Sequence, residues 1–130
     1  MKKMSFDFDY SLSRKSVQKL AKEFIDQGFE IHVVTSRYVD TSRYENTDWQ
    51  ITNNKDLFRV VDHLGIPREN IHFMNMESKD GFFKENPDFL FHLDDDSEEI
   101  TKINKNTDVP GILCTRIDDY WKSLLQIYLK

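Results

Sequence analysis

The feature of this sequence that most constrains its fold is a regular alternation between short apolar runs and amphipathic segments. The apolar runs are rich in branched and aromatic side chains, as strands are. They cover Met4–Phe8, Phe29–Val34, Ile71–Met74, Phe89–Leu93 and Val109–Cys114. Segments with helical spacing follow them, at about 13–28, 54–64, 79–85 and 98–105, and a last one carries Trp121 and Tyr128. The alternation predicts an α/β fold, a three-layer Rossmann-like sandwich with a five-stranded parallel sheet.

Length and composition restrict the classes of protein to consider. The 130 residues suffice for one compact domain, so we expect a single domain over residues 1–130. The net charge of -5 disfavours an extended nucleic-acid duplex footprint. The single cysteine, Cys114, lies in an apolar run and is expected to be buried, in a reducing compartment. No apolar stretch reaches the length of a membrane span or signal segment, so we expect a cytoplasmic protein without a membrane partner.

Polar side chains gather where the predicted strands end. In chain order they are Asp7 and Asp9, then Thr35, Ser36 and Arg37, then Asp94, Asp95 and Asp96. Lys79 precedes the fourth strand, at the start of a short helix. Because ligands of open parallel sheets bind beyond the carboxyl ends of the strands, we expect these side chains to share one crevice. Ser13 and Ser97 are expected to cap the helices that follow the first and fourth strands.

These residue types together favour phosphoryl chemistry. Converging carboxylates repel one another unless a cation lies among them, and hard oxygen ligands favour Mg²⁺. A carboxylate can attack phosphorus, and a second acid can protonate the leaving oxygen and then activate water. A hydroxyl group and a lysine ammonium can hold the phosphoryl oxygens. Three further acids follow Asp95, namely Asp96, Glu98 and Glu99. We expect these to stabilise the start of the next helix through its dipole, and not to belong to the site.

The sequence resembles the haloacid dehalogenase (HAD) superfamily, whose four motifs appear in order over nearly the whole chain. Motif I matches Phe6-Asp7-Phe8-Asp9-Tyr10-Ser11-Leu12, and motif II matches Ile31-His32-Val33-Val34-Thr35. Motif III is a lone lysine, matched by Lys79, with Lys84 as the alternative. Motif IV matches Phe91-His92-Leu93-Asp94-Asp95. One departure is Ser5, which stands in the first strand where an apolar residue is usual.

The resemblance implies a role for each matching residue. Asp7 would be the nucleophile and a metal ligand, and Asp9 the general acid/base, with its carbonyl also on Mg²⁺. Thr35 would bind the phosphoryl group, and Lys79 would stabilise the aspartyl-phosphate. Asp94 or Asp95 would complete the metal site, and which of the two binds the ion directly stays open. The implied activity is a Mg²⁺-dependent phosphatase.

HAD enzymes often carry a cap domain inserted after motif I or between motifs II and III. The spacing of the motifs in this sequence leaves no room for one. Only 25 residues separate Asp9 from Thr35, and 43 separate Thr35 from Lys79. The polar loop 36–52 is at most a lid-like fragment. Its Ser36, Arg37 and Arg43 are expected to bind substrate. Tyr38, Tyr44 and Trp49 could stack on a base, although Tyr44 and Trp49 have the alternative role of anchoring the loop by packing. The layout loosely resembles the 3′-phosphatase domain of polynucleotide kinases, which implies a nucleotide or polynucleotide phosphate as substrate, ahead of a phosphoprotein or a small metabolite.

An acidic pocket on a parallel sheet also suits functions other than a phosphatase. A signalling receiver domain needs its acceptor aspartate after the third strand and a lysine after the fifth, and this sequence has neither. A non-catalytic binding module of the same fold stays an alternative, as does a phosphoprotein phosphatase. The sequence leaves the acceptor, water or alcohol, and the oligomeric state open. The strand histidines His32, His72 and His92 show no metal-ligand spacing and are expected to be packed side chains.

Overall fold

The computed structural model describes residues 1–46 and 53–129, with side chains omitted for 44–46. Part of the predicted recognition loop, including Trp49 and the Tyr44 side chain, therefore lies outside the described residues. The strands are β1 (Lys3–Phe6), β2 (Glu30–Thr35), β3 (Ile71–Phe73), β4 (Phe89–Asp94) and β5 (Gly111–Leu113). The helices are α1 (Lys15–Asp26), α2 (Lys55–Leu64), α3 (Asp80–Glu85), α4 (Ser97–Asn106) and α5 (Tyr120–Ile127). Short helical turns are η1 (Phe8–Leu12), η2 (Thr41–Asn46) and η3 (Arg68–Asn70).

The sheet confirms the predicted α/β class. Its strand order over the described residues is β3-β2-β1-β4-β5, and every pair of neighbours runs parallel. The chain builds outward from β1 to β2 and β3, then crosses to the other side for β4 and β5. This reversal creates a topological switch point between β1 and β4. In open α/β sheets, ligands usually bind at such a point, beyond the carboxyl ends of the strands.

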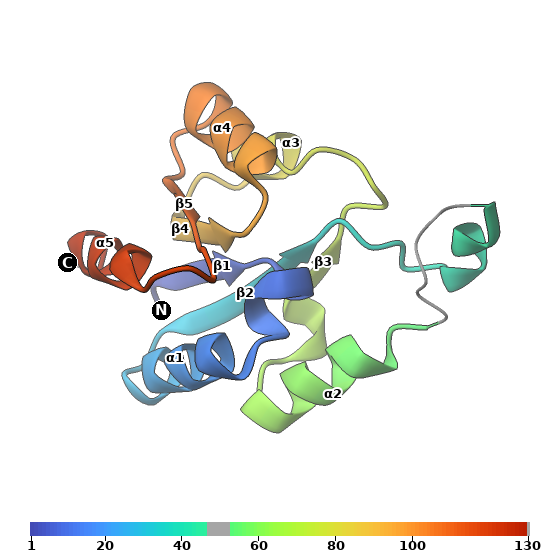
Figure 1. Cartoon of the computed structure of the whole chain (residues 1–130), viewed down its shortest axis with the longest axis horizontal. Helices are drawn as coiled ribbons and strands as arrows, with labels where there is room; N and C mark the ends of the chain where they lie inside the picture. Colours follow the sequence, from blue (N-terminus) through green and yellow to red (C-terminus); the bar gives the residue numbers. More distant parts are fainter. Residues whose placement is uncertain (47–52, 130) are drawn as a thin grey trace.

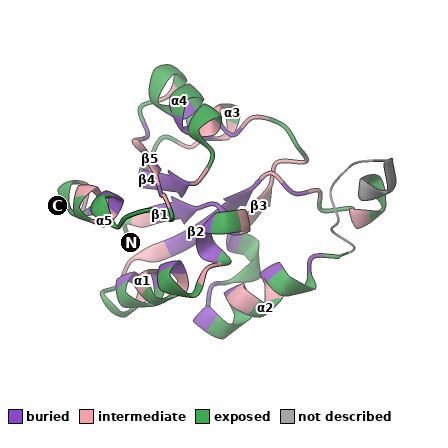
Figure 2. Cartoon of the chain, viewed as in Figure 1, coloured by how far each residue is buried: buried purple, intermediate pink, exposed green. Residues whose placement is uncertain are grey.

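Helices cover both faces of the sheet, which gives the three layers of the sandwich (Figure 1). The larger core packs α1, α2 and α5 against one face, which β1 supplies with Met4 and Phe6. The smaller core packs α3 and α4 against the opposite face, around Phe83 and Ile103. Figure 2 shows the strands buried between these helices. Because side chains alternate along a strand, Ser5 is directed toward the α3/α4 side.

Several element boundaries differ from the predicted ones for local reasons. β1 ends at Phe6, so Asp7 leaves the sheet, and η1 begins one residue later. Ser13 does not cap α1, because its Oγ accepts the Tyr10 backbone N–H at 3.1 Å instead. Asp96, rather than Ser97, caps α4 by accepting the Glu98 and Glu99 backbone N–H groups. β5 starts at Gly111 because the preceding proline has no N–H to donate to the ladder.

Two further expectations concern burial and membranes. Cys114 is buried, as its apolar run predicted. Within residues 1–46 and 53–129, every helix is too short or too polar to cross a lipid bilayer.

Candidate active site

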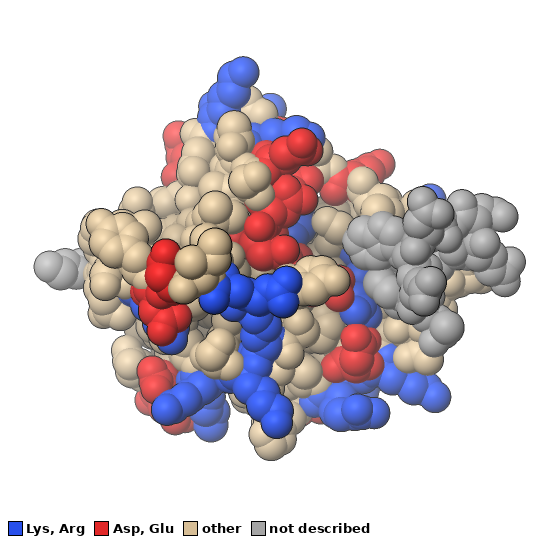
Figure 3. Space-filling view, viewed as in Figure 1, with Lys and Arg blue, Asp and Glu red and all other residues tan. Residues whose placement is uncertain are grey.

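An acidic pocket of about 320 Å³ lies at the carboxyl ends of β1 and β4. Its lining includes Asp7, Asp9, Ser36, Lys79, Asp94 and Asp95. Figure 3 shows acidic side chains gathered on this face, over the loop that leads from β4 into α4, with basic side chains bordering them. The strand order therefore brings the polar residues that follow β1, β2 and β4 to one place, although up to 88 positions separate Asp7 from Asp95.

Lys79 joins the two halves of the pocket. The residue is 1% exposed, and its Nζ donates to Asp7 Oδ1 at 2.7 Å and to Asp94 Oδ2 at 2.6 Å. Burial by itself would lower the pKa of Lys79, but the charges and hydrogen bonds of Asp7 and Asp94 outweigh it and raise the pKa. Lys79 is thus a fixed ammonium group between two carboxylates, where a phosphoryl group held by either would meet it.

Asp7 is nearly buried, with 6% of its surface exposed. Its backbone N–H donates to Leu93 O at 2.8 Å, which fixes the residue beside the end of β4. Burial raises the pKa of Asp7 well above its usual value, Lys79 opposes this shift, and the nearby Asp94 charge adds to it. Burial and a nearby like charge both destabilise the ionised carboxylate. A bound cation, or a covalent bond that removes the charge, would therefore stabilise Asp7.

Asp94 is held by donors on both oxygens. Oδ2 accepts from His92 Nε2 at 2.8 Å as well as from Lys79, and Oδ1 accepts from the Asp96 backbone N–H at 3.1 Å. Burial would raise the pKa of Asp94, but the His92 hydrogen bond and the Lys79 charge keep it below the usual range. Asp94 is therefore an ionised anchor for Lys79.

His92 is itself oriented by a buried hydroxyl. Its Nδ1 lies 2.7 Å from Ser5 Oγ, and both residues are 0% exposed. Burial lowers the pKa of His92, so the imidazole is neutral. A neutral ring that donates through Nε2 to Asp94 must accept through Nδ1, so Ser5 is the donor of this bond. Ser5 thus supports Asp94 through His92, from the neighbouring strand β1.

Three carboxylates in the pocket could hold a metal ion together. Oxygen atoms of Asp7, Asp94 and Asp95 lie within 4.8 Å of one another. Asp95 is the most accessible of the three, whereas Asp94 already accepts three hydrogen bonds. Carboxylate oxygens of this number and spacing suit a hard divalent cation such as Mg²⁺. Asp7 and Asp95 are accordingly the better placed direct ligands, with Asp94 beside them.

Asp9 lies two residues beyond Asp7 and is paired with Arg37. The Arg37 Nε and Nη2 groups donate to the two Asp9 oxygens at 3.0 and 2.7 Å. The same guanidinium donates to both oxygens of Asp56 at 2.8 and 2.9 Å, and only 3% of it is exposed. Burial would lower the pKa of Arg37, but these carboxylates raise it. Arg37 therefore ties Asp9 to the first turn of α2 in this conformation, instead of projecting into the pocket.

The remaining predicted residues are placed at different depths. Thr35 is 0% exposed, and its Oγ1 accepts the Arg37 backbone N–H at 3.2 Å. Ser36 lines the pocket. Arg43 packs its guanidinium 4.2 Å from the Tyr38 ring centroid and is not among the described residues that line the pocket. The predicted roles of these residues in binding substrate stay predictions.

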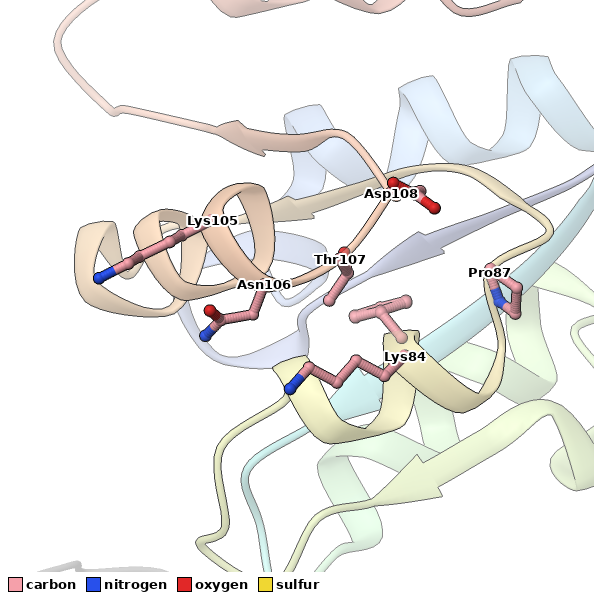
Figure 4. Close-up of a pocket in the computed structure, with 7 residues that line it drawn as sticks. Lys84, Pro87, Lys105, Asn106, Thr107 and Asp108 are labelled. Carbon is pink, nitrogen blue, oxygen red and sulfur yellow. The ribbon is translucent and has the colours of Figure 1, made fainter.

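Lys84 belongs to another cavity. It lines a pocket of about 250 Å³ with Lys105 and Asp108, formed by the C-terminal parts of α3 and α4 (Figure 4). Lys79 contacts both Asp7 and Asp94, so the geometry favours Lys79 over Lys84 as the lysine of the site.

Sequence reasoning missed several residues of the site. Ser5 and His92 had one signal, since polar side chains in apolar strands need partners when buried. Asp56 had none, because an acid in the first turn of a helix already has a local explanation. Tyr10 and Met76 also line the pocket, and only the three-dimensional arrangement brings them there.

Comparison with known proteins adds no assignment. No model of a known protein family matches the chain, and no curated protein matches it.

Proposed function

We propose that this protein is a cap-free, HAD-type phosphatase that requires Mg²⁺ and acts through an aspartyl-phosphate on Asp7. The observation that carries the proposal is the Lys79 ammonium between Asp7 and Asp94, with Asp95 beside them, at the topological switch point of a parallel sheet. Burial of a lysine among converging carboxylates costs desolvation free energy, and groups with pKa values perturbed in this way cluster at functional sites. The resemblance to the four HAD motifs supports the same conclusion.

The proposed reaction has two steps. An Asp7 carboxylate oxygen attacks phosphorus, the bond from phosphorus to the leaving oxygen breaks, and Asp9 gives that oxygen a proton. Asp9 then takes a proton from water as the water oxygen attacks phosphorus, which frees phosphate and restores Asp7. Lys79 offsets the charge of the phosphoryl oxygens during both steps. Bound Mg²⁺ would supply further charge neutralisation and alignment of the phosphate.

Arg37 has a defined place in this scheme. It donates to both oxygens of Asp9, which fixes the orientation of this side chain. For the first step, Asp9 must leave Arg37, take up a proton from solvent and turn toward the leaving oxygen, while Arg37 keeps its bonds to Asp56. The Arg37–Asp56 pair thus gives the guanidinium a fixed position from which Asp9 can detach.

We further propose a nucleotide or polynucleotide phosphate as the substrate, ahead of a phosphoprotein. The support is the loose likeness to polynucleotide 3′-phosphatase domains and the absence of room for a cap. A pocket that residues 1–46 and 53–129 leave open suits a substrate that itself extends beyond the phosphate. Cytoplasmic location is proposed on the lone buried cysteine.

Hydrolysis of 4-nitrophenyl phosphate tests the proposal, with Mg²⁺, with chelator, and in the Asp7→Asn variant. Asp26→Asn, on the exposed end of α1, is the matched control. We expect activity that requires Mg²⁺, persists in Asp26→Asn and is lost in Asp7→Asn. Activity unchanged by Asp7→Asn would contradict the mechanism. Failure to hydrolyse aryl phosphates, nucleotides, phosphorylated oligonucleotides and phosphopeptides alike would favour the non-catalytic binding module.

A further inference from the structure

We propose that Tyr10 and Met76 form a recognition site for a nucleobase carried by the phosphorylated substrate. This inference rests on the proposed phosphatase function and names the group that its substrate carries beyond the phosphate. Both residues line the same pocket as Asp7 and Lys79. Neither belongs to the machinery that acts on phosphorus, so their presence in an acidic pocket needs another explanation.

The first observation is exposure. Tyr10 is 59% exposed and Met76 is 41% exposed, although large apolar side chains of this kind are usually buried. Single exposed apolar residues are common on protein surfaces and by themselves indicate nothing. Here the two meet at one pocket whose other lining groups are mostly carboxylates and hydroxyls. An apolar pair at the rim of a charged pocket provides contacts that a phosphate group cannot use.

The second observation is independent and concerns the backbone. Tyr10 has φ 59° and Met76 has φ 69°, in the left-handed region that side chains other than glycine rarely adopt. Local bonds hold both conformations: the Tyr10 N–H donates to Ser13 Oγ at 3.1 Å, and the Met76 N–H donates to Ser36 O at 2.7 Å. Strained backbone of this kind collects at functional sites, where it fixes a side chain in a required position.

The chemistry of the two side chains indicates a planar ring. A tyrosine ring stacks on a base through its flat face, and a methionine thioether makes favourable contacts with aromatic rings. The Arg116 guanidinium lies 5.2 Å from the Tyr10 ring centroid, where it supports one face of the ring and adds positive charge next to the acidic pocket. The other face of the ring is the one that a base would use.

The depth of the nucleophile favours a nucleobase over a ring bonded directly to phosphate. Asp7 is 6% exposed, whereas Tyr10 is 59% exposed at the rim. A group that contacts both must span from a buried carboxylate to the surface. A nucleotide does so because its sugar separates the base from the phosphate, while an aryl phosphate has no such spacer.

Binding measurements test this recognition site. Adenosine 5′-monophosphate, ribose 5-phosphate and phenyl phosphate would be titrated by calorimetry, with Mg²⁺, into the Asp7→Asn protein, which prevents turnover. We expect the nucleotide to bind about tenfold more tightly than ribose 5-phosphate. Adding Tyr10→Asn should remove this preference, and asparagine tolerates the left-handed backbone. Tyr120→Asn, which removes another exposed tyrosine, should retain it.

A methyl NMR signal provides a second measurement. The nucleotide should shift the Met76 methyl resonance, and ribose 5-phosphate should not. Equal affinities for the nucleotide and the sugar phosphate, or a preference that survives Tyr10→Asn, would overturn the inference. Phenyl phosphate bound as tightly as the nucleotide would overturn the nucleobase assignment. Selective nucleotide binding by a protein whose wild type hydrolyses no phosphate would support the recognition site and overturn the proposed catalytic function.

Discussion

The hydrogen bonds behind Asp94 lead to a quantitative prediction for the substitution His92→Phe. Phenylalanine keeps a ring beside Phe83, whose centroid lies 4.9 Å from that of His92, but it cannot donate to Asp94. Loss of a hydrogen bond to a charged group costs roughly 2 kcal/mol, and leaving the Ser5 hydroxyl buried and unpaired costs roughly 1 kcal/mol more. We therefore expect His92→Phe to lower the free energy of unfolding by about 3 kcal/mol.

Companion variants separate the hydrogen bonds from packing. Ser5→Ala should lower the free energy of unfolding by about 1 kcal/mol. The double variant His92→Phe/Ser5→Ala should lose about 2 kcal/mol, and not the roughly 4 kcal/mol expected if the single losses added, because it leaves no unpaired hydroxyl. His92→Gln can still donate to Asp94 through its amide and should lose only about 1 kcal/mol. Urea unfolding at neutral pH, followed by circular dichroism, measures the four variants against the wild type.

Two results would rule out a stabilising hydrogen bond from His92 to Asp94. Stability of His92→Phe within about 0.5 kcal/mol of the wild type would mean that Asp94 does not depend on the His92 donor. Equal losses in the phenylalanine and glutamine variants would attribute the effect to packing and not to the hydrogen bond.

The remaining predictions concern pH, the Arg37 pairs and the metal. Burial, aided by the charges of His32 and Lys3, lowers the pKa of His72 to about 4. The unfolded chain takes up this proton first, near pH 6.5, so stability should fall by about 2 kcal/mol between about pH 6.5 and 4, after allowance for partial exposure. In urea titrations across this range, His72→Val should flatten the fall, and the exposed His63→Gln should not. Arg37→Met should destabilise by about 1.5 kcal/mol, because it removes the hydrogen bonds of a buried guanidinium while water still solvates the partly exposed Asp9 and Asp56; a loss below about 0.5 kcal/mol would contradict the network. Mg²⁺ at about ten times its Kd should raise the free energy of unfolding by about 1.4 kcal/mol, and chelator should reverse the gain, in a thermal-shift assay.

The fold was predictable because it depends on patterns that the sequence carries locally. Apolar runs of strand length, separated by amphipathic helices, leave few arrangements other than a parallel sheet between helical layers. Glycines also marked where two helices end. Gly28 and Gly65 follow α1 and α2 with left-handed backbone, at φ of 93° and 78°, which glycine adopts readily. Boundaries were less predictable, because Ser13 and Asp96 each had a choice of backbone partner that depended on neighbouring residues.

The proximity of the predicted site residues also followed from the sequence, since residues beyond the ends of parallel strands meet at one edge of the sheet. Asp7, Lys79, Asp94 and Asp95 come together there. The surroundings were not foreseen. The Arg37 side chain pairs with carboxylates from two elements, and no local pattern reveals a choice between those partners and a substrate.

The central claim is that Asp7 becomes phosphorylated. The most direct measurement is mass spectrometry of the protein quenched in acid during turnover of an aryl phosphate with Mg²⁺, followed by peptide mapping. We expect one phosphoryl group on the peptide that contains Asp7, absent in Asp7→Asn and discharged by hydroxylamine. Steady turnover with no phosphoryl group on that peptide, or with the group on another residue, would rule out Asp7 as the nucleophile.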